Sequence, residues 1–296
     1  MRALILTLTL AAAAADVSPA YRATIEKHRA DRVKELTAPS GWLAVRGLFW
    51  LHDGANGAGS DPSAEIRLPA RTPGKIGVFT LKDNAVTFTA DPRAGVTSAG
   101  KPVETVTLDA RKGEAAAVTV NGVSLFAIRR ADKIGLRMLD PESDARRHFD
   151  GLTYFPLGTK YHVQAKWVPY EKAKTVLVPN VLGQLVPMES PGTVEFTIDG
   201  QPYSLEPVYE TAKHEDLFFI FRDLTSRAET YAAGRFLHTP LPKDGGVDLD
   251  FNLAYNPPCA FTDFATCPLP IKGNQLQVRI PAGERRWAGH DGRSSR

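Results

Sequence analysis

The segment Leu249-Asp-Phe-Asn-Leu-Ala-Tyr-Asn-Pro-Pro-Cys-Ala-Phe-Thr-Asp-Phe-Ala-Thr-Cys-Pro-Leu-Pro270 is the most chemically specified part of the chain. Its 22 residues hold both cysteines, four prolines and four Asp or Asn side chains. Cys259 and Cys267 are too far apart for a Cys-x-x-Cys redox pair, and two thiols are too few for a zinc site. The spacing therefore favours a disulfide-closed loop, with a metal site or a reactive thiol as the alternatives.

The N-terminus predicts the compartment of these cysteines. Met1-Arg2 is a short basic segment, Ala3 to Leu10 is apolar, and Ala11 to Ala15 is a run of small residues, as in a secretory signal peptide. The apolar run is too short to span a bilayer, and no later segment has the required length. We therefore expect an exported protein, periplasmic or secreted, without a membrane span.

Export strengthens the disulfide interpretation, because thiols in oxidising compartments persist mainly as disulfides. In the loop-entropy model, closing so short a loop removes about 2.5 kcal/mol of denatured-chain entropy. Pro257, Pro258 and Pro268 stand next to the two cysteines and restrict the backbone further. The loop is predicted to hold a single shape.

The composition is that of a globular protein with a good core, since 43% of the residues are apolar. The net charge of +3 comes from 36 basic and 33 acidic residues, and the basic residues are scattered. Nucleic acid is not indicated as a partner, because binding would need a coherent basic face. The sequence points to no particular protein partner.

The chain is predicted to be mainly β, with an N-terminal helix followed by two β units of sandwich or barrel type. Ser18-Pro19 begins the helix, and apolar residues recur near helical spacing until Pro39-Ser40-Gly41. Many short strand candidates follow at regular intervals, which is typical of sandwiches and barrels.

Residue pairs typical of tight turns separate these strand candidates. Asn121-Gly122 predicts the clearest hairpin, because this pair adopts the positive φ angles of a type I′ turn. Asp83-Asn84 and Asp199-Gly200 predict two further turns, and Gly54 to Ser60 is predicted to be a glycine-rich turn. The second unit is expected to contain strands at Tyr161 to Trp167 and Thr175 to Val178.

A charged stretch from Asp140 to Arg146 separates two groups of strand candidates and suggests a domain boundary. We therefore expect a signal peptide over 1–15, the helix and a linker over 16–41, a first β domain over 42–145, a second over 146–288 that carries the Asn-Pro-Pro-Cys loop, and a disordered basic tail over 289–296.

Several motifs resemble a known family. They are Gly47-Leu-Phe-Trp-Leu51, Tyr231-Ala-Ala-Gly-Arg-Phe-Leu237, Tyr255-Asn-Pro-Pro-Cys-Ala-Phe261 and Cys267-Pro-Leu-Pro270. Together they resemble the bacterial proteins of domain of unknown function 1684, over a span from about Tyr21 to Trp287. The resemblance supports the importance of the C-terminal motif, and the family brings no established reaction with it.

The first half is also similar in outline to a forkhead-associated sandwich. Gly59-Ser60-Asp61-Pro62, a strand candidate at Glu65 to Leu68 and the Asn121-Gly122 hairpin follow the opening pattern of that domain. The Ser-x-x-His of phosphothreonine recognition does not follow the strand. Only the shape is carried over, and phosphopeptide binding is disfavoured.

Polar side chains near the cysteine loop are the candidates for a site that holds a small polar molecule. A carboxylate acting as acid or base, with an arginine or an amide supporting negative charge, would make this site catalytic. The candidate catalytic residues are Asp223, Arg235 and Asn256, and the candidate ligand-binding residues are Asp250, Asn252, Tyr255, Cys259, Phe261 and Cys267.

Each candidate also has a structural interpretation. Strict alternation over Val247 to Asn252 puts Asp250 and Asn252 on one polar face, which can simply be solvated. Asp223 can cap a turn through the Thr225 backbone, and Arg235 can pair with a carboxylate. The sequence leaves these alternatives open.

Other catalytic signatures were sought among the remaining residues. The seven histidines show no metal-binding spacing, and His214, between Lys213 and two carboxylates, is the best candidate base. Nucleophile elbows and phosphate-binding glycine loops are missing from the sequence, so no metal and no cofactor are expected. Two hypotheses remain: an exported hydrolase-like enzyme, or a non-catalytic periplasmic ligand-binding or protein-interaction module.

Overall fold

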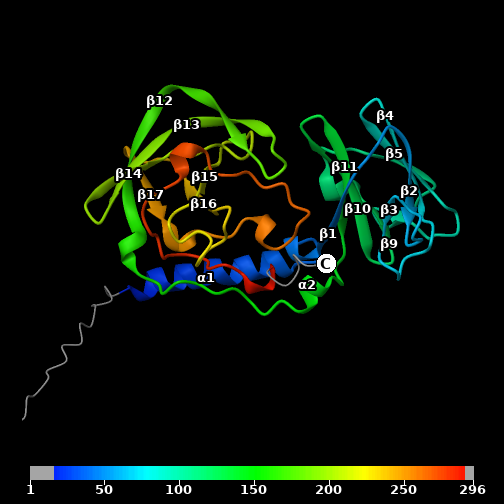
Figure 1. Ribbon diagram of the computed structural model, residues 1–296, viewed down its shortest axis with the longest axis horizontal. Helices are drawn as coiled ribbons and strands as arrows, with labels where there is room; N and C mark the ends of the chain where they lie inside the picture. Colours follow the sequence, from blue (N-terminus) through cyan, green and yellow to red (C-terminus); the bar gives the residue numbers. More distant parts are fainter. Residues whose placement is uncertain (1–16, 291–296) are drawn as a thin grey trace, which may run out of the picture.

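The computed structural model describes residues 17–290 and is drawn in Figure 1. Helix α1 (Pro19–Thr37) confirms the predicted N-terminal helix. The Ser18 side chain accepts a hydrogen bond from the Tyr21 backbone N–H, and Pro19 occupies the first turn, where it costs no helical hydrogen bond. The predicted signal peptide and the end of the predicted tail lie outside the described residues.

Two sheets pack face to face in the first β unit. Phe79, Phe88, Leu125 and Leu136 are fully buried between them, and each such side chain stabilises the fold by about 1.5–3 kcal/mol. One sheet has the order β1 (Val45–Trp50), β11 (Lys133–Leu139), β10 (Val123–Arg130), β9 (Val118–Val120), β6 (Thr97–Ser98), β7 (Lys101–Pro102). The other has the order β3 (Ile66–Arg67), β2 (Gly54–Gly59), β4 (Gly77–Lys82), β5 (Ala85–Ala90), β8 (Thr105–Leu108).

The predicted hairpin turns are confirmed. Asp83 and Asn84 have φ angles of 49° and 62° between β4 and β5, and Asn121 and Gly122 have φ angles of 47° and 77° between β9 and β10. Asp199-Gly200 turns the chain in the same way in the second unit. Short polar residues and glycine reach these angles at low steric cost, which is why the sequence signal was reliable.

The glycine-rich segment after Trp50 corrects one prediction. Gly54–Gly59 forms strand β2, paired with β4, and is no turn. A Cβ atom added to Gly59 would lie 1.9 Å from the Gly74 carbonyl oxygen, so the backbone approaches too closely for any other residue. Gly59 therefore allows two main chains to pack closely.

The second β unit contains a four-stranded antiparallel sheet and a two-stranded one. The larger sheet has the order β14 (Gln201–Leu205), β13 (Leu185–Ile198), β12 (His162–Pro179), β17 (Gly246–Asp250). The smaller pairs β15 (Asp216–Phe221) with β16 (Arg235–Pro240). Phe219, Phe221, Leu249 and Phe251 are fully buried in the core between them.

Strand β12 is longer than the sequence suggested. Its 18 residues include the predicted strand at Thr175 to Val178, all of the predicted strand at Tyr161 to Trp167 except Tyr161, and the segment between them. The pairing with β13 shifts register between Pro169 and Lys174, and such an irregularity accommodates a residue without a backbone N–H. Because Pro169 interrupts the strand pattern in the sequence, one continuous strand was predicted as two.

The observed architecture confirms the predicted fold class: mainly β, with an N-terminal helix followed by two β units. The sheets are open, and within residues 17–290 none closes into a barrel. A short helix, α2 (Asp144–Arg147), follows β11 in the charged stretch where a boundary was expected. The domain limits and the forkhead-associated outline remain predictions.

The cysteine loop lies between the two β units, as the orange segment of Figure 1 shows. Thr262 Oγ1 donates a 2.9 Å hydrogen bond to the Val45 carbonyl, and Arg130 Nε donates one of 2.6 Å to Thr266 Oγ1. Phe264 packs against the outer face of the first unit, which includes Phe126. The loop therefore contacts the first β unit as well as the second, which carries it.

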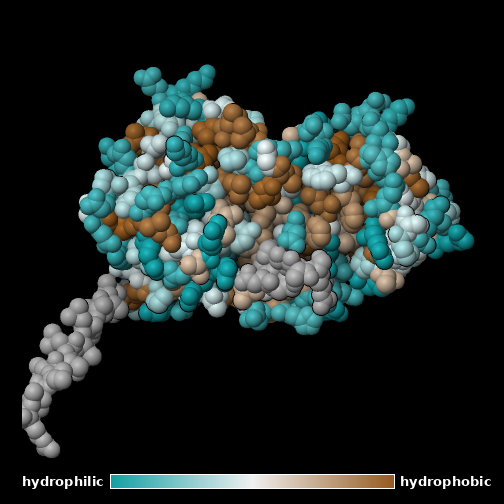
Figure 2. Space-filling model, viewed as in Figure 1, coloured by the Kyte–Doolittle hydropathy of each residue, from teal (hydrophilic) through white to brown (hydrophobic). Residues whose placement is uncertain are grey.

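Exposed apolar side chains gather at the turn of the β12–β13 hairpin, and Figure 2 shows them as brown patches beside the gap between the units. They are Leu177, Val181, Leu182, Leu185 and Val186. None of the helices within residues 17–290 combines the length and apolar character that crossing a bilayer requires.

Candidate functional site

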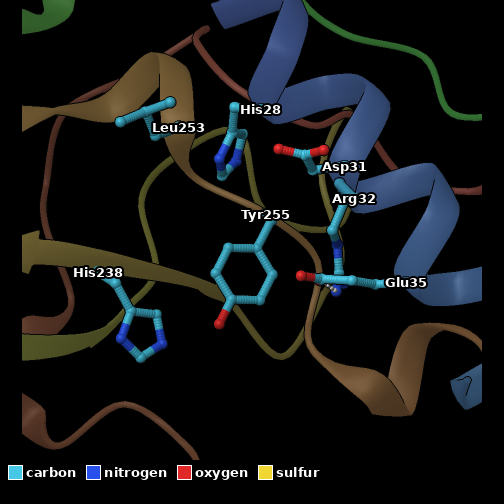
Figure 3. A pocket seen from close by; sticks show the side chains of 7 residues that line it. All are labelled: His28, Asp31, Arg32, Glu35, His238, Leu253 and Tyr255. Atoms are coloured by element: carbon cyan, nitrogen blue, oxygen red, sulfur yellow. Dashed lines mark ion pairs between the residues drawn. The ribbon is translucent and has the colours of Figure 1, made fainter. Parts of the chain in front are cut away.

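A cavity of about 380 Å³ opens between helix α1 and the second β unit. Figure 3 shows its lining side chains, with Tyr255 between the helix and His238. Helix α1 contributes four residues, strand β16 one, and the segment after β17 two: His28, Asp31, Arg32, Glu35, His238, Leu253 and Tyr255.

The helical residues reach the cavity because of their spacing. His28, Asp31, Arg32 and Glu35 follow one another at steps of three, one and three positions, which puts them on one face of a helix. Ile25 and Leu36 are fully buried and hold the helix against the rest of the fold.

A polar network fixes the N-terminal end of α1 on the second unit. The Tyr21 hydroxyl donates a 2.8 Å hydrogen bond to Asp250 Oδ2 and accepts one of 2.9 Å from Asn252 Nδ2. The Tyr21 ring also stacks on the ring of His162 at 5.1 Å. Asp250 and Asn252, predicted to bind ligand, therefore position the helix that lines the cavity.

Arg32 forms the floor of the cavity. Its Nε lies 3.2 Å from Glu284 Oε1, and its NH2 group donates a 2.9 Å hydrogen bond to the Asn256 carbonyl. The guanidinium stands over the Tyr255 ring, 4.6 Å from the ring centre. Burial raises the pKa of Glu284, while the Arg32 charge acts in the opposite direction. The buried carboxylate thus offsets the Arg32 charge.

His238 faces Tyr255 from strand β16. Its Nδ1 lies 2.8 Å from Asp216 Oδ2, and its Nε2 lies 3.8 Å from Glu210 Oε2. The imidazole stacks on Phe218 at 4.6 Å and on Tyr255 at 6.0 Å. When Nδ1–H is donated to the Asp216 carboxylate, Nε2 is the nitrogen that lies near the Glu210 carboxylate.

The charge around the cavity is predominantly negative. Asp31 and Glu35 are exposed carboxylates at the rim, where Asp31 pairs with Lys27 and Glu35 Oε2 lies 3.9 Å from Arg32 NH1. Glu210 and Asp216 flank His238, and Glu284 contacts Arg32 from the buried side, so these carboxylates outnumber Lys27 and Arg32. Burial, and after it the Arg32 charge, lowers the pKa of His28, so this imidazole is neutral at neutral pH. A cationic group would complement this arrangement.

The predicted catalytic pair forms a buried structural ion pair. Arg235 NH2 lies 3.1 Å from Asp223 Oδ1, and both side chains are 0% exposed. Arg235 also donates to the carbonyls of Ile280 and Ala282, and Asp223 accepts the Ile280 backbone N–H at 2.6 Å. Both side chains are fully buried and neither lines the cavity, so the acid–base role predicted for them stays a prediction.

Asn256, the third predicted catalytic residue, is also fully buried. Its backbone N–H donates to Glu284 Oε2 at 2.8 Å, and its Nδ2 donates to the Arg285 carbonyl at 2.8 Å. Through its backbone, Asn256 hydrogen-bonds to both Arg32 and Glu284. Asn256 is not a lining residue, and its predicted catalytic role stays a prediction.

The cysteine loop contributes nothing to the cavity lining. Phe261 is fully buried and packs on Trp287 with ring centres 5.3 Å apart. The predicted disulfide is not formed in this structure, in which Cys259 and Cys267 are free, buried thiols. The Cys259 backbone N–H donates to Cys267 Sγ at 3.1 Å, which brings the two residues together without a covalent bond.

Of the nine residues proposed from the sequence, only Tyr255 lines the cavity. His214, the histidine proposed as a base, stacks on Tyr209 at 3.9 Å and is not a lining residue. Sequence reasoning missed His28, Asp31, Arg32 and Glu35, although their spacing on a predicted helix was a usable signal. No sequence pattern identified His238 as a site residue, because its carboxylate partner Asp216 lies 22 positions away in sequence.

The family model for proteins of unknown function, DUF1684, matches residues 147–285. This span is shorter than the one drawn from the motifs and leaves out α1. A similar solved structure is the solution structure of an uncharacterized protein from Haloarcula marismortui, with 35% sequence identity over 47% of this chain and 78% of that one, and a TM-score of 0.41. No curated protein matches the chain.

Proposed function

We propose that this chain, which belongs to the DUF1684 family, binds a small cationic molecule in the cavity between α1 and Tyr255. The observation that carries the proposal is the surplus of carboxylates around a cavity with an aromatic wall. A cavity of about 380 Å³ falls within the range of small-molecule sites.

The lining residues favour a ligand with two kinds of group. An ammonium group would be attracted by the Asp31 and Glu35 carboxylates, and a small apolar or aromatic part would pack against Tyr255 and Leu253. The Arg32 charge does not oppose this, because Glu284 offsets it from the buried side.

A hydrolytic activity at the same cavity is the second candidate function. The Asp216–His238 pair supports it, because a carboxylate-oriented imidazole can serve as a general base toward water. None of the seven lining residues is a serine, threonine or cysteine, so water would be the nucleophile. Binding without turnover needs fewer assumptions and is the function that we propose.

The proposal includes export to the periplasm or the medium. Its support is the sequence of residues 1–15, with a basic start, an apolar run and small residues. Mass spectrometry of the protein recovered from a periplasmic fraction would test it, since the mature N-terminus should lie after the alanine run. Recovery of a chain that still begins at Met1 from the cytoplasm alone would contradict it.

Isothermal calorimetry tests the binding proposal with benzylamine and choline as cationic probes and benzoate as an anionic one. We expect saturable binding of the cations only. Asp31→Asn with Glu35→Gln should weaken it about thirtyfold, because each exposed carboxylate contributes on the order of 1 kcal/mol to attraction and the two together about 2 kcal/mol. Asp132→Asn with Glu114→Gln removes the same charge from exposed positions of the first unit and serves as the control.

Equal binding of all three probes, or equal weakening by both double variants, would contradict a charge-selective site. An assay of ester and amide hydrolysis with His238→Gln separates the second candidate. A turnover that this variant abolishes would favour the enzyme over the binding protein.

A further inference from the structure

Arg32 keeps one edge of its guanidinium unused by the fold. Its Nε donates to Glu284 Oε1 at 3.2 Å, and its NH2 group donates to the Asn256 carbonyl at 2.9 Å. The NH1 group lies 3.9 Å from Glu35 Oε2, which is an ion-pair contact but too long for a hydrogen bond. Within residues 17–290, NH1 therefore has no hydrogen-bond partner and can donate to a bound molecule.

The fold holds this guanidinium in place at the cavity. It lies over the rings of Tyr255 and Phe261, at 4.6 Å and 5.7 Å from the ring centres. Only 10% of the side chain is exposed, and Arg32 lines the cavity, where Figure 3 shows it beside Tyr255 and Glu35. Ring contacts occupy the faces of a guanidinium and leave the N–H groups at its edge able to donate. An anionic group could therefore bind NH1 without a rearrangement of Arg32, which reduces the ordering cost of binding.

Charges of both signs stand close together on this face of α1. Arg32 and Glu35 are three positions apart, which places their Cβ atoms about 5–6 Å apart, and Asp31 lines the same cavity. The Glu35 side chain is 72% exposed, so its carboxylate can turn toward a ligand, whereas Arg32 is held by its partners. An α-amino acid carries its ammonium group and its carboxylate on the same carbon atom. Its two charges therefore match the spacing of Arg32 and Glu35 on the helix.

The wall across from α1 is built from two rings and a leucine, as Figure 3 shows. The rings of His238 and Tyr255 stack with their centres 6.0 Å apart, and Leu253 lies beside them in the lining. Flat rings and an aliphatic side chain pack well against an apolar or aromatic group. The lining thus favours an amino acid with a side chain of that kind.

We propose that the bound molecule is a free α-amino acid with an apolar or aromatic side chain, whose carboxylate accepts a hydrogen bond from Arg32 NH1 while its ammonium group contacts Glu35 or Asp31. This inference rests on the proposed function, because the ammonium group takes the place of the cation there. It also reverses one expectation. In a cavity that selects cations by charge alone, Asp31 and Glu35 would repel a carboxylate on the ligand, whereas beside Arg32 that carboxylate gains a charge-assisted hydrogen bond.

Calorimetry of the full chain at pH 7 tests the inference with three probes that share a phenyl ring. L-Phenylalanine carries both charges, phenethylamine carries the ammonium group alone, and N-acetyl-L-phenylalanine carries the carboxylate alone. We expect phenylalanine to bind about tenfold more tightly than phenethylamine, since a charge-assisted hydrogen bond contributes a factor of this order, and N-acetyl-L-phenylalanine to show no saturable binding. Equal or tighter binding of phenethylamine would overturn the amino-acid inference and leave the proposed cation site in place. Failure of both phenylalanine and phenethylamine to bind would overturn the inference and the proposed function together.

A variant of Arg32 tests whether its NH1 group supplies the extra affinity. Arg32→Lys keeps a positive charge near Glu284 but lacks the NH1 donor, so the ratio of phenylalanine to phenethylamine affinity should fall from about ten to about one. Arg22→Lys makes the same exchange at an exposed position of α1 and should leave the ratio unchanged. Because both ligands are measured on the same protein, a loss of folded Arg32→Lys does not alter the ratio, and the wild-type comparison decides the question if this variant fails to fold. An unchanged ratio in Arg32→Lys would overturn the proposal.

Discussion

At the scale of single residues, buried charge distinguishes structural side chains from accessible ones. Asp223 and Arg235 are both fully buried and bonded to each other and to the chain around Ile280. Removing one member of such a pair leaves the other charge buried without compensation, which typically costs about 3–5 kcal/mol. These residues hold the C-terminal segment against strand β16.

We therefore predict that Asp223→Asn lowers the free energy of unfolding by about 3 kcal/mol or more. Denaturation in guanidinium chloride, followed by circular dichroism, measures the change. Asp248→Asn is the matched control, because Asp248 is an exposed carboxylate on β17, and its removal should cost less than about 1 kcal/mol. A small loss in Asp223→Asn would show that the pair does not support the fold.

His28 gives a pH-dependent prediction. Burial lowers its folded-state pKa below the ordinary value, so the folded protein prefers the neutral imidazole. The contribution of His28 to stability is complete above the unfolded pKa of about 6.5 and is lost as pH falls through the lower folded pKa. Melting temperatures between pH 7 and pH 5 should fall less steeply in His28→Gln than in the wild type.

His148→Gln serves as the control for that comparison, because His148 is exposed on the surface after α2. Its melting curve should follow the wild type across the same pH range. If His28→Gln and the wild type lose stability in parallel, the imidazole of His28 does not titrate as the geometry implies.

At the scale of elements, strand β2 depends on close contact between two backbones. Gly59→Ala would place a methyl group 1.9 Å from the Gly74 carbonyl oxygen, whereas Gly57→Ala on the same strand meets no atom within 4 Å. We predict that Gly59→Ala destabilises the protein by at least about 2 kcal/mol and that Gly57→Ala changes stability by less than about 1 kcal/mol. Thermal denaturation of the two variants side by side measures this, and similar melting temperatures would contradict the packing of β2.

The elements were predictable where local chemistry determines them. Ser18-Pro19 marks a helix start, and Asn121-Gly122 marks a turn, because cap and turn geometry need only neighbouring residues. Strand β2 was missed because the need for glycine at position 59 comes from its contact with Gly74, which is distant in sequence. Strand β12 was divided because the register shift at Pro169 depends on the partner strand.

The candidate site was less predictable than the elements. Strict alternation put Asp250 and Asn252 on a solvated face, but β17 ends at Asp250 and a tight turn carries Asn252 inward to Tyr21. The cavity itself needs α1 to lie across the second unit, a tertiary arrangement that no local pattern encodes. Tyr255 was found because it stands in the most specified segment of the chain.

At the scale of the whole molecule, the cysteine loop and helix α1 connect parts that are distant in sequence. The loop docks on the first β unit through Thr262 and Phe264, and α1 lies along the second unit, as Figure 1 shows. The cavity is closed on one side by α1, which lies outside the residues matched by the family model. Binding at this cavity is thus a property of the helix and the second β unit together.

The most direct test of the binding proposal is a crystal structure of the full chain with benzylamine. We predict that the ammonium group lies within hydrogen-bond distance of the Asp31 or Glu35 carboxylate, with the ring against Tyr255. An unoccupied cavity at a benzylamine concentration that saturates the protein in calorimetry, or benzylamine bound elsewhere, would contradict the account.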